Sequence, residues 1–238
     1  MKKVNCIYFI VVTAIFLFAR CSEFDSNDLF LDETEKEYKL YDPYVDEYGN
    51  KGVVACIARY NSELAFIIVL SSDEAYLEWG QMQEIVYKDS ISSSIIKQTD
   101  YSLCVQQFMY GLGMENYPAQ AWCLKKNGES AIPYSGSWHL PSAYEYKLIF
   151  GDNGNRLTSL NNALRKINGT PVDKNKYYWT CLEDFERLII LPNQPNDYDP
   201  ANRAFMTSPD GHTYSNKDLW LKKNTNHVRA IKYIYYKD

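Results

Sequence analysis

Strand-like runs stand at both ends of the body of this chain, and helical patterns fill the middle. Residues 53–58 and 64–70 are two apolar runs separated by Asn61 and Ser62, a pattern typical of a β-hairpin with a buried second strand. Residues 228–236 form another apolar run near the C-terminus. Strands at both ends with helices between them predict an α+β domain in which the last strand returns to the first hairpin.

Helical periodicity marks several segments of the middle region. The clearest has Ser142 as a good N-cap and Glu145 three residues later, which is the spacing of a capping box. This helix is expected to end at Gly151, and the helix after it to run from a Thr or Ser cap to Asn168 and Gly169. The helices are expected at 99–111, 119–126, 142–151 and 157–167, and further strands at 176–182, 187–191 and 204–207.

The N-terminus has the pattern of an export signal. Lys2 and Lys3 precede an apolar run from Cys6 to Ala19 that only Thr13 interrupts. A run of 14 residues is short for a hydrocarbon core of ~30 Å and suits a signal peptide. The sequence therefore predicts an exported protein with a leader at residues 1–20.

Cys21 follows this run directly and begins a polar, acidic stretch. The arrangement resembles the lipobox of bacterial lipoproteins, in which the cysteine is diacylated and becomes the first residue; Arg20 stands where that pattern has Gly, Ala or Ser. Two acyl chains make a stable membrane anchor, and the acidic residues resemble the export tag of Bacteroidetes-type surface lipoproteins. An uncleaved anchor and plain secretion with an unmodified Cys21 are the alternatives. The expected organisation is a signal peptide at 1–20, an acidic tether at 21–50 and one domain at 51–238.

The charge balance argues against a nucleic-acid partner. The chain has 25 basic and 30 acidic residues and an isoelectric point near 5.3. Loss of the leader removes Lys2, Lys3 and Arg20 and leaves 22 basic residues against 30 acidic ones. A surface that binds phosphate backbones needs the opposite excess.

Cysteine spacing indicates neither a metal site nor a reactive pair. The body contains Cys56, Cys104, Cys123 and Cys181, which in an envelope protein form two disulfides in one of three connectivities, form one bridge, or stay buried as free thiols. No C-x-x-C occurs, and the three histidines are scattered, so no zinc motif is present. We expect no cofactor.

Three segments in order carry a family resemblance: WHLPSAYEY at 138–146, YYWTCLE at 177–183 and HVRAIKYI at 227–234. Their order and spacing resemble the C-terminal domain of Legionella collagen-like proteins and the related major paralogous domain of bacterial surface proteins. The Trp-Gly step within 77–80 is similar to an early motif of that family. The resemblance covers about residues 51–238. It implies a C-type-lectin-like fold with a small twisted antiparallel sheet, flanking helices and long irregular loops.

Within these motifs we expect scaffold roles. Arg229 stands between apolar neighbours on an expected strand, and a buried guanidinium needs an acidic partner. Glu145 and Glu183 are the candidates, because both occupy positions that recur in the family pattern. The expected structural residues are Trp138, Leu140, Pro141, Glu145, Trp179, Glu183 and Arg229.

Ligand contacts are expected in the irregular segments 183–187, 192–202 and 208–226. These stretches are too rich in Asn, Asp, Pro and Gly to form sheet and too long to be minimal connections, and long loops on a rigid scaffold are where recognition sites concentrate. Residues 193–199 resemble the Gln-Pro-Asp element of C-type lectins, so a Ca²⁺ site is the alternative to a solvated loop. The candidate ligand-binding residues are Asn196, Asp197, Tyr198, Asp199, Asp210, His212, Tyr214 and Trp220.

The sequence favours a surface-exposed lipoprotein of the outer membrane that binds a glycan or a protein without catalysis. Its 21 tyrosines suit binding surfaces as well as exposed strands. No G-x-S-x-G or H-E-x-x-H motif occurs, so no catalytic residue is assigned. The alternatives are an enzyme of uncertain class, related in fold to formylglycine-generating enzymes, and a structural, fimbria-associated envelope component.

Mass spectrometry of the native N-terminus tests the anchor. We expect the mature chain to begin at Cys21 and to carry acyl chains on that residue. An intact leader, or an unmodified Cys21, would contradict the lipoprotein assignment.

Overall fold

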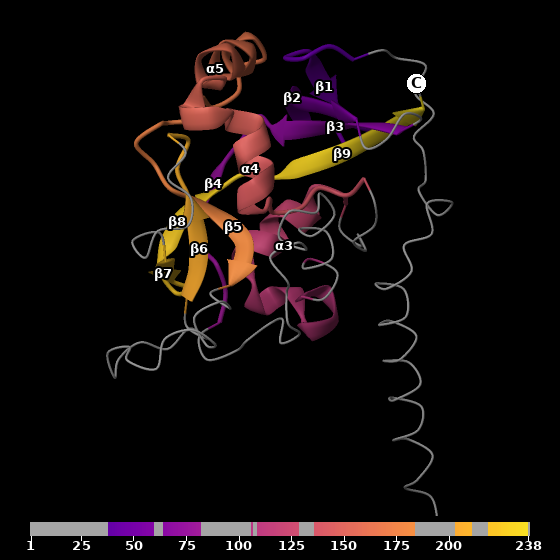
Figure 1. Ribbon diagram of the computed structural model, residues 1–238. Coiled ribbons are helices and arrows are strands. Elements are labelled where there is room, and N and C mark those ends of the chain that lie inside the picture. The colour runs from indigo at the N-terminus through magenta and orange to yellow at the C-terminus, as the bar shows by residue number, and fades with distance from the viewer. Residues whose placement is uncertain are drawn as a thin grey trace, which may run out of the picture. The chain divides into compact units, whose positions relative to one another are not determined.

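The computed structural model has a mixed α+β fold with two small sheets that are mainly antiparallel (Figure 1). This agrees with the α+β class expected from the sequence. The helices lie between and beside the two sheets. The structure describes residues 38–59, 64–81, 106, 109–128, 136–183, 203–210 and 219–237.

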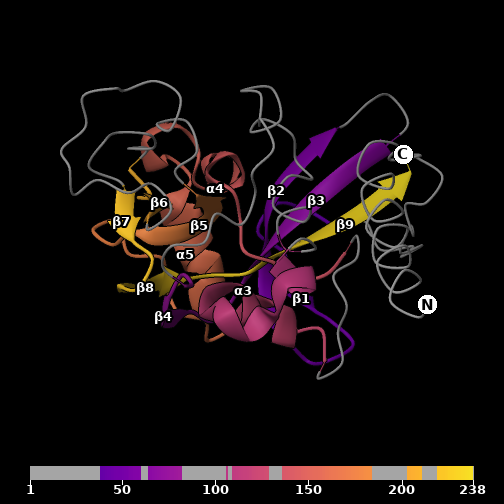
Figure 2. The same cartoon turned by 90° about the horizontal axis from the view of Figure 1, so that it is seen from below.

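The first sheet, sheet A, has the strand order β1-β2-β3-β9, and all its neighbours are antiparallel. Ile67 in β3 lies opposite Ile234 in β9, which confirms that the last strand returns to the first hairpin. Figure 2 shows β2, β3 and β9 side by side. The strands are β1 (Pro43–Val45), β2 (Lys51–Arg59), β3 (Leu64–Ser71) and β9 (Ile231–Lys237).

The second sheet, sheet B, has the order β4-β8-β5-β6-β7. Its one parallel pairing joins β5 to β8 through Tyr178 and His227. The single strand expected at 228–236 is therefore wrong, because the chain leaves sheet B at Val228 and enters sheet A at Ile231. The strands are β4 (Ala75–Glu78), β5 (Tyr178–Glu183), β6 (Arg203–Thr207), β7 (Leu219–Leu221) and β8 (Thr225–Val228).

Helix α4 contacts strands of both sheets and begins as the sequence predicts. The Ser142 hydroxyl accepts a hydrogen bond from the Glu145 amide at 3.2 Å, and the Glu145 carboxylate accepts one from the Ser142 amide at 2.6 Å. The Thr or Ser cap expected for α5 is wrong, since the N-cap is Arg156 and makes no side-chain capping bond. The helices are α3 (Pro118–Lys125), α4 (Ala143–Phe150) and α5 (Leu157–Lys166), with 3-10 turns η1 (Met114–Asn116) and η2 (Asp152–Gly154).

Of the other expected elements, the helix at 99–111 is described only at 106 and 109–111, which are helical. The strand expected at 187–191 and the leader at 1–20 lie outside the described residues. No helix in the described part of the chain is long and apolar enough to cross a membrane.

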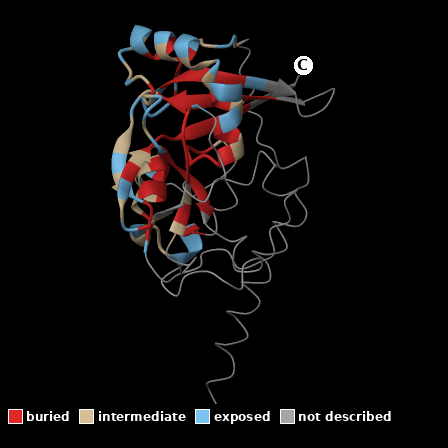
Figure 3. Cartoon of the chain, turned by 60° about the vertical axis from the view of Figure 1, so that its left-hand side comes forward, coloured by how far each residue is buried: buried red, intermediate tan, exposed pale blue. Residues whose placement is uncertain are grey.

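Three buried tryptophans tie the layers together through their indole N–H groups. Trp138 donates to the Asp46 carboxylate at 2.6 Å, Trp79 to the Thr180 carbonyl at 2.7 Å, and Trp179 to the Leu77 carbonyl at 2.9 Å. A buried donor without a partner costs about 1–3 kcal/mol, so each partner is part of the fold. Figure 3 shows the buried strands inside and exposed residues on the outer side of α5.

The compact domain includes residues that the sequence assigned to the tether. Strand β1 pairs with β2 from Pro43 to Val45, and Asp46 is the buried partner of Trp138. Residues 38–50 therefore belong with the domain, and the boundary expected at 51 was placed too late. The acidic, tyrosine-rich composition of residues 38–50 did not indicate that they are part of the domain. Asp46 is polar, and its burial depends on its hydrogen bonds, which composition does not reveal.

Arg229 is buried, and its acidic partner in the described part of the chain is Glu74, which was not predicted from the sequence. Its guanidinium Nη2 lies 3.0 Å from the Glu74 carboxylate, and it also donates to the carbonyls of Ser71 and Thr170. Glu145 caps α4 instead, and the side chain of Glu183 lies outside the described part. Glu74 could not be identified as the partner from the sequence, because it is far from Arg229 along the chain. Only the pairing of β4 with β8 brings the two residues together.

His139 is a buried histidine inside the motif at 138–146. Its Nδ1 donates to the Ser137 carbonyl at 2.7 Å, which leaves Nε2 without a hydrogen-bond partner within the described residues. Glu145 Oε1 is 4.0 Å from Nε2, too far for a hydrogen bond. Burial therefore dominates and lowers the pKa of His139 from 6.5 to about 4.

Acid should weaken the fold through His139. Between pH 6.5 and 4 the unfolded histidine is protonated and the native one is not, so the unfolded state binds more protons and stability rises with pH. We expect this residue to contribute about 3 kcal/mol of stability at pH 7 that is lost as the pH falls to 4.

Urea denaturation of the wild type and of His139→Asn between pH 4 and 7.5 measures this effect. Asparagine keeps a donor near the Nδ1 position but does not titrate. The stability advantage of the wild type should shrink as the pH falls through this window, and a constant difference would contradict the assignment.

Candidate functional site

Most of the ligand-binding residues expected from the sequence cannot be placed. Asn196, Asp197, Tyr198, Asp199, His212 and Tyr214 lie outside the described residues, as does Cys21. Trp220 pairs with Ala204 through the backbone of β7, and its side chain is outside the described part. Asp210 is described, is exposed, and accepts a hydrogen bond from the Ser208 hydroxyl.

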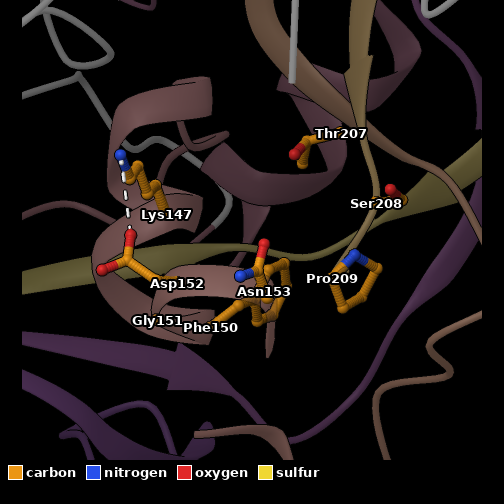
Figure 4. Close-up of a pocket in the computed structure, with 8 residues that line it drawn as sticks. All are labelled: Lys147, Phe150, Gly151, Asp152, Asn153, Thr207, Ser208 and Pro209. Atoms are coloured by element: carbon orange, nitrogen blue, oxygen red, sulfur yellow. Dashed lines mark ion pairs between the residues drawn. The ribbon is translucent and has the colours of Figure 1, made fainter. Parts of the chain in front are cut away.

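The start of the segment 208–226 forms one wall of a small cavity, which we call the α4–β6 cavity (Figure 4). The opposite wall is the end of α4 and the turn η2. The cavity encloses about 140 Å³. Its lining residues are Lys147, Phe150, Gly151, Asp152, Asn153, Thr207, Ser208 and Pro209.

Three residues with positive φ shape the turn that forms one wall of the cavity. The backbone has positive φ at Gly151 (75°), Asn153 (53°) and Gly154 (68°), a region that Gly and Asn tolerate better than other residues. Gly154 lies so close to the Pro209 carbonyl oxygen that an added Cβ would overlap it. The turn is therefore held directly against the segment that follows β6.

Polar and apolar residues line this cavity together. Phe150 and Pro209 are buried, and Lys147 and Asp152 are exposed at the rim, where Lys147 Nζ is 3.6 Å from the Asp152 carboxylate. In the close-up, Thr207 and Ser208 lie on the side opposite Lys147 and Asp152. Hydroxyl, amide, ammonium and carboxylate groups beside an apolar surface are the elements of small-molecule recognition.

Six lining residues lie outside the segments in which the sequence predicted ligand contact: Lys147, Phe150, Gly151, Asp152, Asn153 and Thr207. The signal that was available is the segment Gly-Asp-Asn-Gly at 151–154 directly after a capped helix. By itself such a segment indicates only a turn. Its closeness to Pro209 depends on long-range packing and could not be inferred from spacing.

The described cysteines do not offer a nucleophile. Cys56, Cys123 and Cys181 are free and buried, and burial raises the pKa of each thiol above its ordinary value. Cys104 lies outside the described residues. Among the residues that the structure describes, no group of three His, Cys, Asp or Glu side chains is arranged to hold a metal ion.

Comparison with known proteins found no matching family model and no matching curated protein. Among solved structures, the chain is similar to a fimbrial protein from Bacteroides ovatus with 14% sequence identity and a TM-score of 0.46. The similarity covers 69% of this chain and 35% of that protein. A likeness at this level does not bear on the function of this chain.

The contact between Gly154 and Pro209 can be tested with a matched pair of variants. Gly49→Ala introduces a side chain at positive φ with nothing within 4 Å, and should cost about 1 kcal/mol through backbone strain alone. Gly154→Ala adds the overlap with Pro209 and should cost about 1–2 kcal/mol more. Equal losses of unfolding free energy in urea for the two variants would show that the turn does not press against the wall.

Proposed function

We propose that this protein is a surface-displayed lipoprotein whose domain recognises a glycan without catalysis. Cys21, placed between the apolar leader and the acidic stretch, is the anchor. The domain is related to the C-type-lectin-like domains that the sequence motifs resemble. The α4–β6 cavity is the glycan-binding site.

The single observation that supports this proposal is the composition of the cavity. Its lining combines the apolar residues Phe150 and Pro209 with hydroxyl, amide and charged side chains. A sugar ring presents the same combination, with an apolar face and hydroxyl groups around its edge. Polar groups at defined positions on an apolar surface give orientation and specificity to such a ligand.

The size of the cavity limits what it can hold. About 140 Å³ is well below the ~300 Å³ at the lower end of clefts that enclose drug-sized ligands. The site therefore takes one ring or the end of a chain, while the remaining sugars lie outside. Tyr198, Asp199 and Tyr214, the loop residues that the sequence identified, lie outside the described residues.

Glycan-array binding of the mature chain tests the proposal. Asn153→Gly removes the amide but keeps a residue that tolerates positive φ, and Lys147→Gln removes the rim ammonium. Each substitution should weaken glycan binding by roughly tenfold or less. This is the loss expected for one hydrogen bond, to an uncharged group in Asn153→Gly and to a charged group in Lys147→Gln.

The matched control is Lys166→Gln, which changes an exposed lysine at the end of α5 and should leave binding unchanged. All variants should retain the thermal unfolding midpoint of the wild type. Absence of glycan binding, or undiminished binding by both cavity variants, would contradict the proposal.

A further inference from the structure

A second surface of sheet B carries an ordered row of rings beside a cluster of charges. Tyr76 in β4 lies opposite His227 in β8, and His227 lies opposite Tyr178 in β5. The ring centroids are 5.1 Å apart for Tyr76 and His227, and 5.7 Å apart for His227 and Tyr178. The row passes from the exposed edge strand into the core, because Tyr76 is 60% exposed and Tyr178 is buried.

One carboxylate lies at the centre of the charges beside this row. Glu74 Oε2 is 3.0 Å from Arg229 Nη2, and Glu74 Oε1 is 3.3 Å from Lys176 Nζ and 3.2 Å from His227 Nδ1. Tyr178 also donates to Glu74, at 3.5 Å. We call Glu74, Lys176, Tyr178, His227 and Arg229 the Glu74 cluster.

The Glu74 cluster has more positive than negative charge on its outer side. The Arg229 side chain is 0% exposed and that of Glu74 is 12% exposed. These two residues form a buried ion pair in which the two charges neutralise each other. Lys176 is 38% exposed and His227 17% exposed, and both lie at the same Glu74 oxygen. Glu74 is already paired with Arg229, so the Lys176 ammonium leaves positive charge at the surface of a protein that is acidic overall, and protonation of His227 adds to it.

The outer groups have hydrogen-bonding capacity left over. Within the described residues, the Lys176 ammonium bonds only to Glu74, and the buried Nδ1 of His227 has no hydrogen-bond partner. An ammonium has three donors, and a protonated imidazole donates from both nitrogens. The ring of Tyr76 is exposed directly beside them.

We propose that Tyr76, Lys176 and His227 form a binding site for a carboxylated sugar, such as a uronic acid. Lys176 and protonated His227 bind the carboxylate of the ligand, and the exposed ring of Tyr76 packs against the flat apolar face of the sugar. Glu74 and Arg229 are positioning residues, which hold Lys176 and His227 at the surface. The site lies across Tyr178 from the α4–β6 cavity and does not depend on the proposed role of that cavity.

The same chemistry predicts the pH dependence of binding. His227 faces Glu74, Lys176, Arg229 and the rings of Tyr76 and Tyr178. Burial lowers the pKa of His227, and Glu74 partly opposes that effect. A ligand carboxylate prefers the protonated imidazole, so affinity should increase as the pH falls from 8 to 5.

Isothermal titration of the full mature chain with a galacturonic acid trimer tests the site, with a galactose trimer as the neutral probe of equal size. At pH 6 and low salt, the acidic trimer should bind at least roughly tenfold more tightly than the neutral one, as expected for a charge-assisted bond. Lys176→Gln should remove that preference. Tyr76→Ala should weaken binding roughly fivefold, whereas Tyr76→Phe should retain it. His227→Gln should remove the dependence on pH.

Lys147→Gln separates this proposal from the α4–β6 cavity, because that variant should keep the preference for the acidic trimer over the neutral one, whatever its effect on glycan binding in the cavity. Lys166→Gln, at an exposed lysine outside both sites, should leave both affinities unchanged. If Lys147→Gln lost the preference for the acidic trimer and Lys176→Gln kept it, the carboxylate would bind in the cavity, and the second site would be overturned. Equal affinity for the two trimers, no binding of the acidic trimer, or unchanged binding by Lys176→Gln and Tyr76→Ala would also overturn it. Thermal unfolding of each variant confirms that a loss of binding is not a loss of fold.

Discussion

The buried ion pair between Arg229 and Glu74 is the contact on which the arrangement of the two sheets depends. Arg229 lies where the chain leaves β8 in sheet B and enters β9 in sheet A. Its guanidinium bonds to Ser71 at the end of β3, to Glu74 before β4 and to Thr170 after α5. Breaking a buried pair by removing one partner typically costs about 3–5 kcal/mol. One residue therefore holds both sheets and a connecting loop at their junction.

The parts of this fold that the sequence predicted are those governed by local chemistry. The hairpin of β2 and β3 followed from two apolar runs, and the start of α4 from the spacing of Ser142 and Glu145. What the sequence did not show depends on contacts between distant segments. Asp46 looked like part of a solvated tether because its partner, Trp138, is 92 residues away. The break in the last strand was hidden for a similar reason, since Arg229 interrupts an apolar run only because its partners lie on other elements.

The same distinction applies to the candidate site. Sequence reasoning placed ligand contact in the segment 208–226, and the first residues of that segment, Ser208 and Pro209, do line the α4–β6 cavity. The opposite wall was missed because a Gly-Asp-Asn-Gly turn has the same composition whether or not it lines a cavity. The positive charge of the Glu74 cluster was missed as well. Its members lie in β5, in β8 and in the loops next to β4, β5 and β8, and only the register of sheet B brings them together.

The register of sheet B also relates the two proposed binding surfaces. Thr207, at the α4–β6 cavity, lies opposite Tyr178, which is followed across the sheet by His227 and then Tyr76. At about 4.8 Å between neighbouring strands, Thr207 and Tyr76 are about 14 Å apart. Tyr146 and Phe150 of α4 pack against Tyr178 between them, so the two surfaces are separate but fixed to the same strands. The spacing between the two proposed surfaces is therefore set by the backbone hydrogen bonds of the sheet.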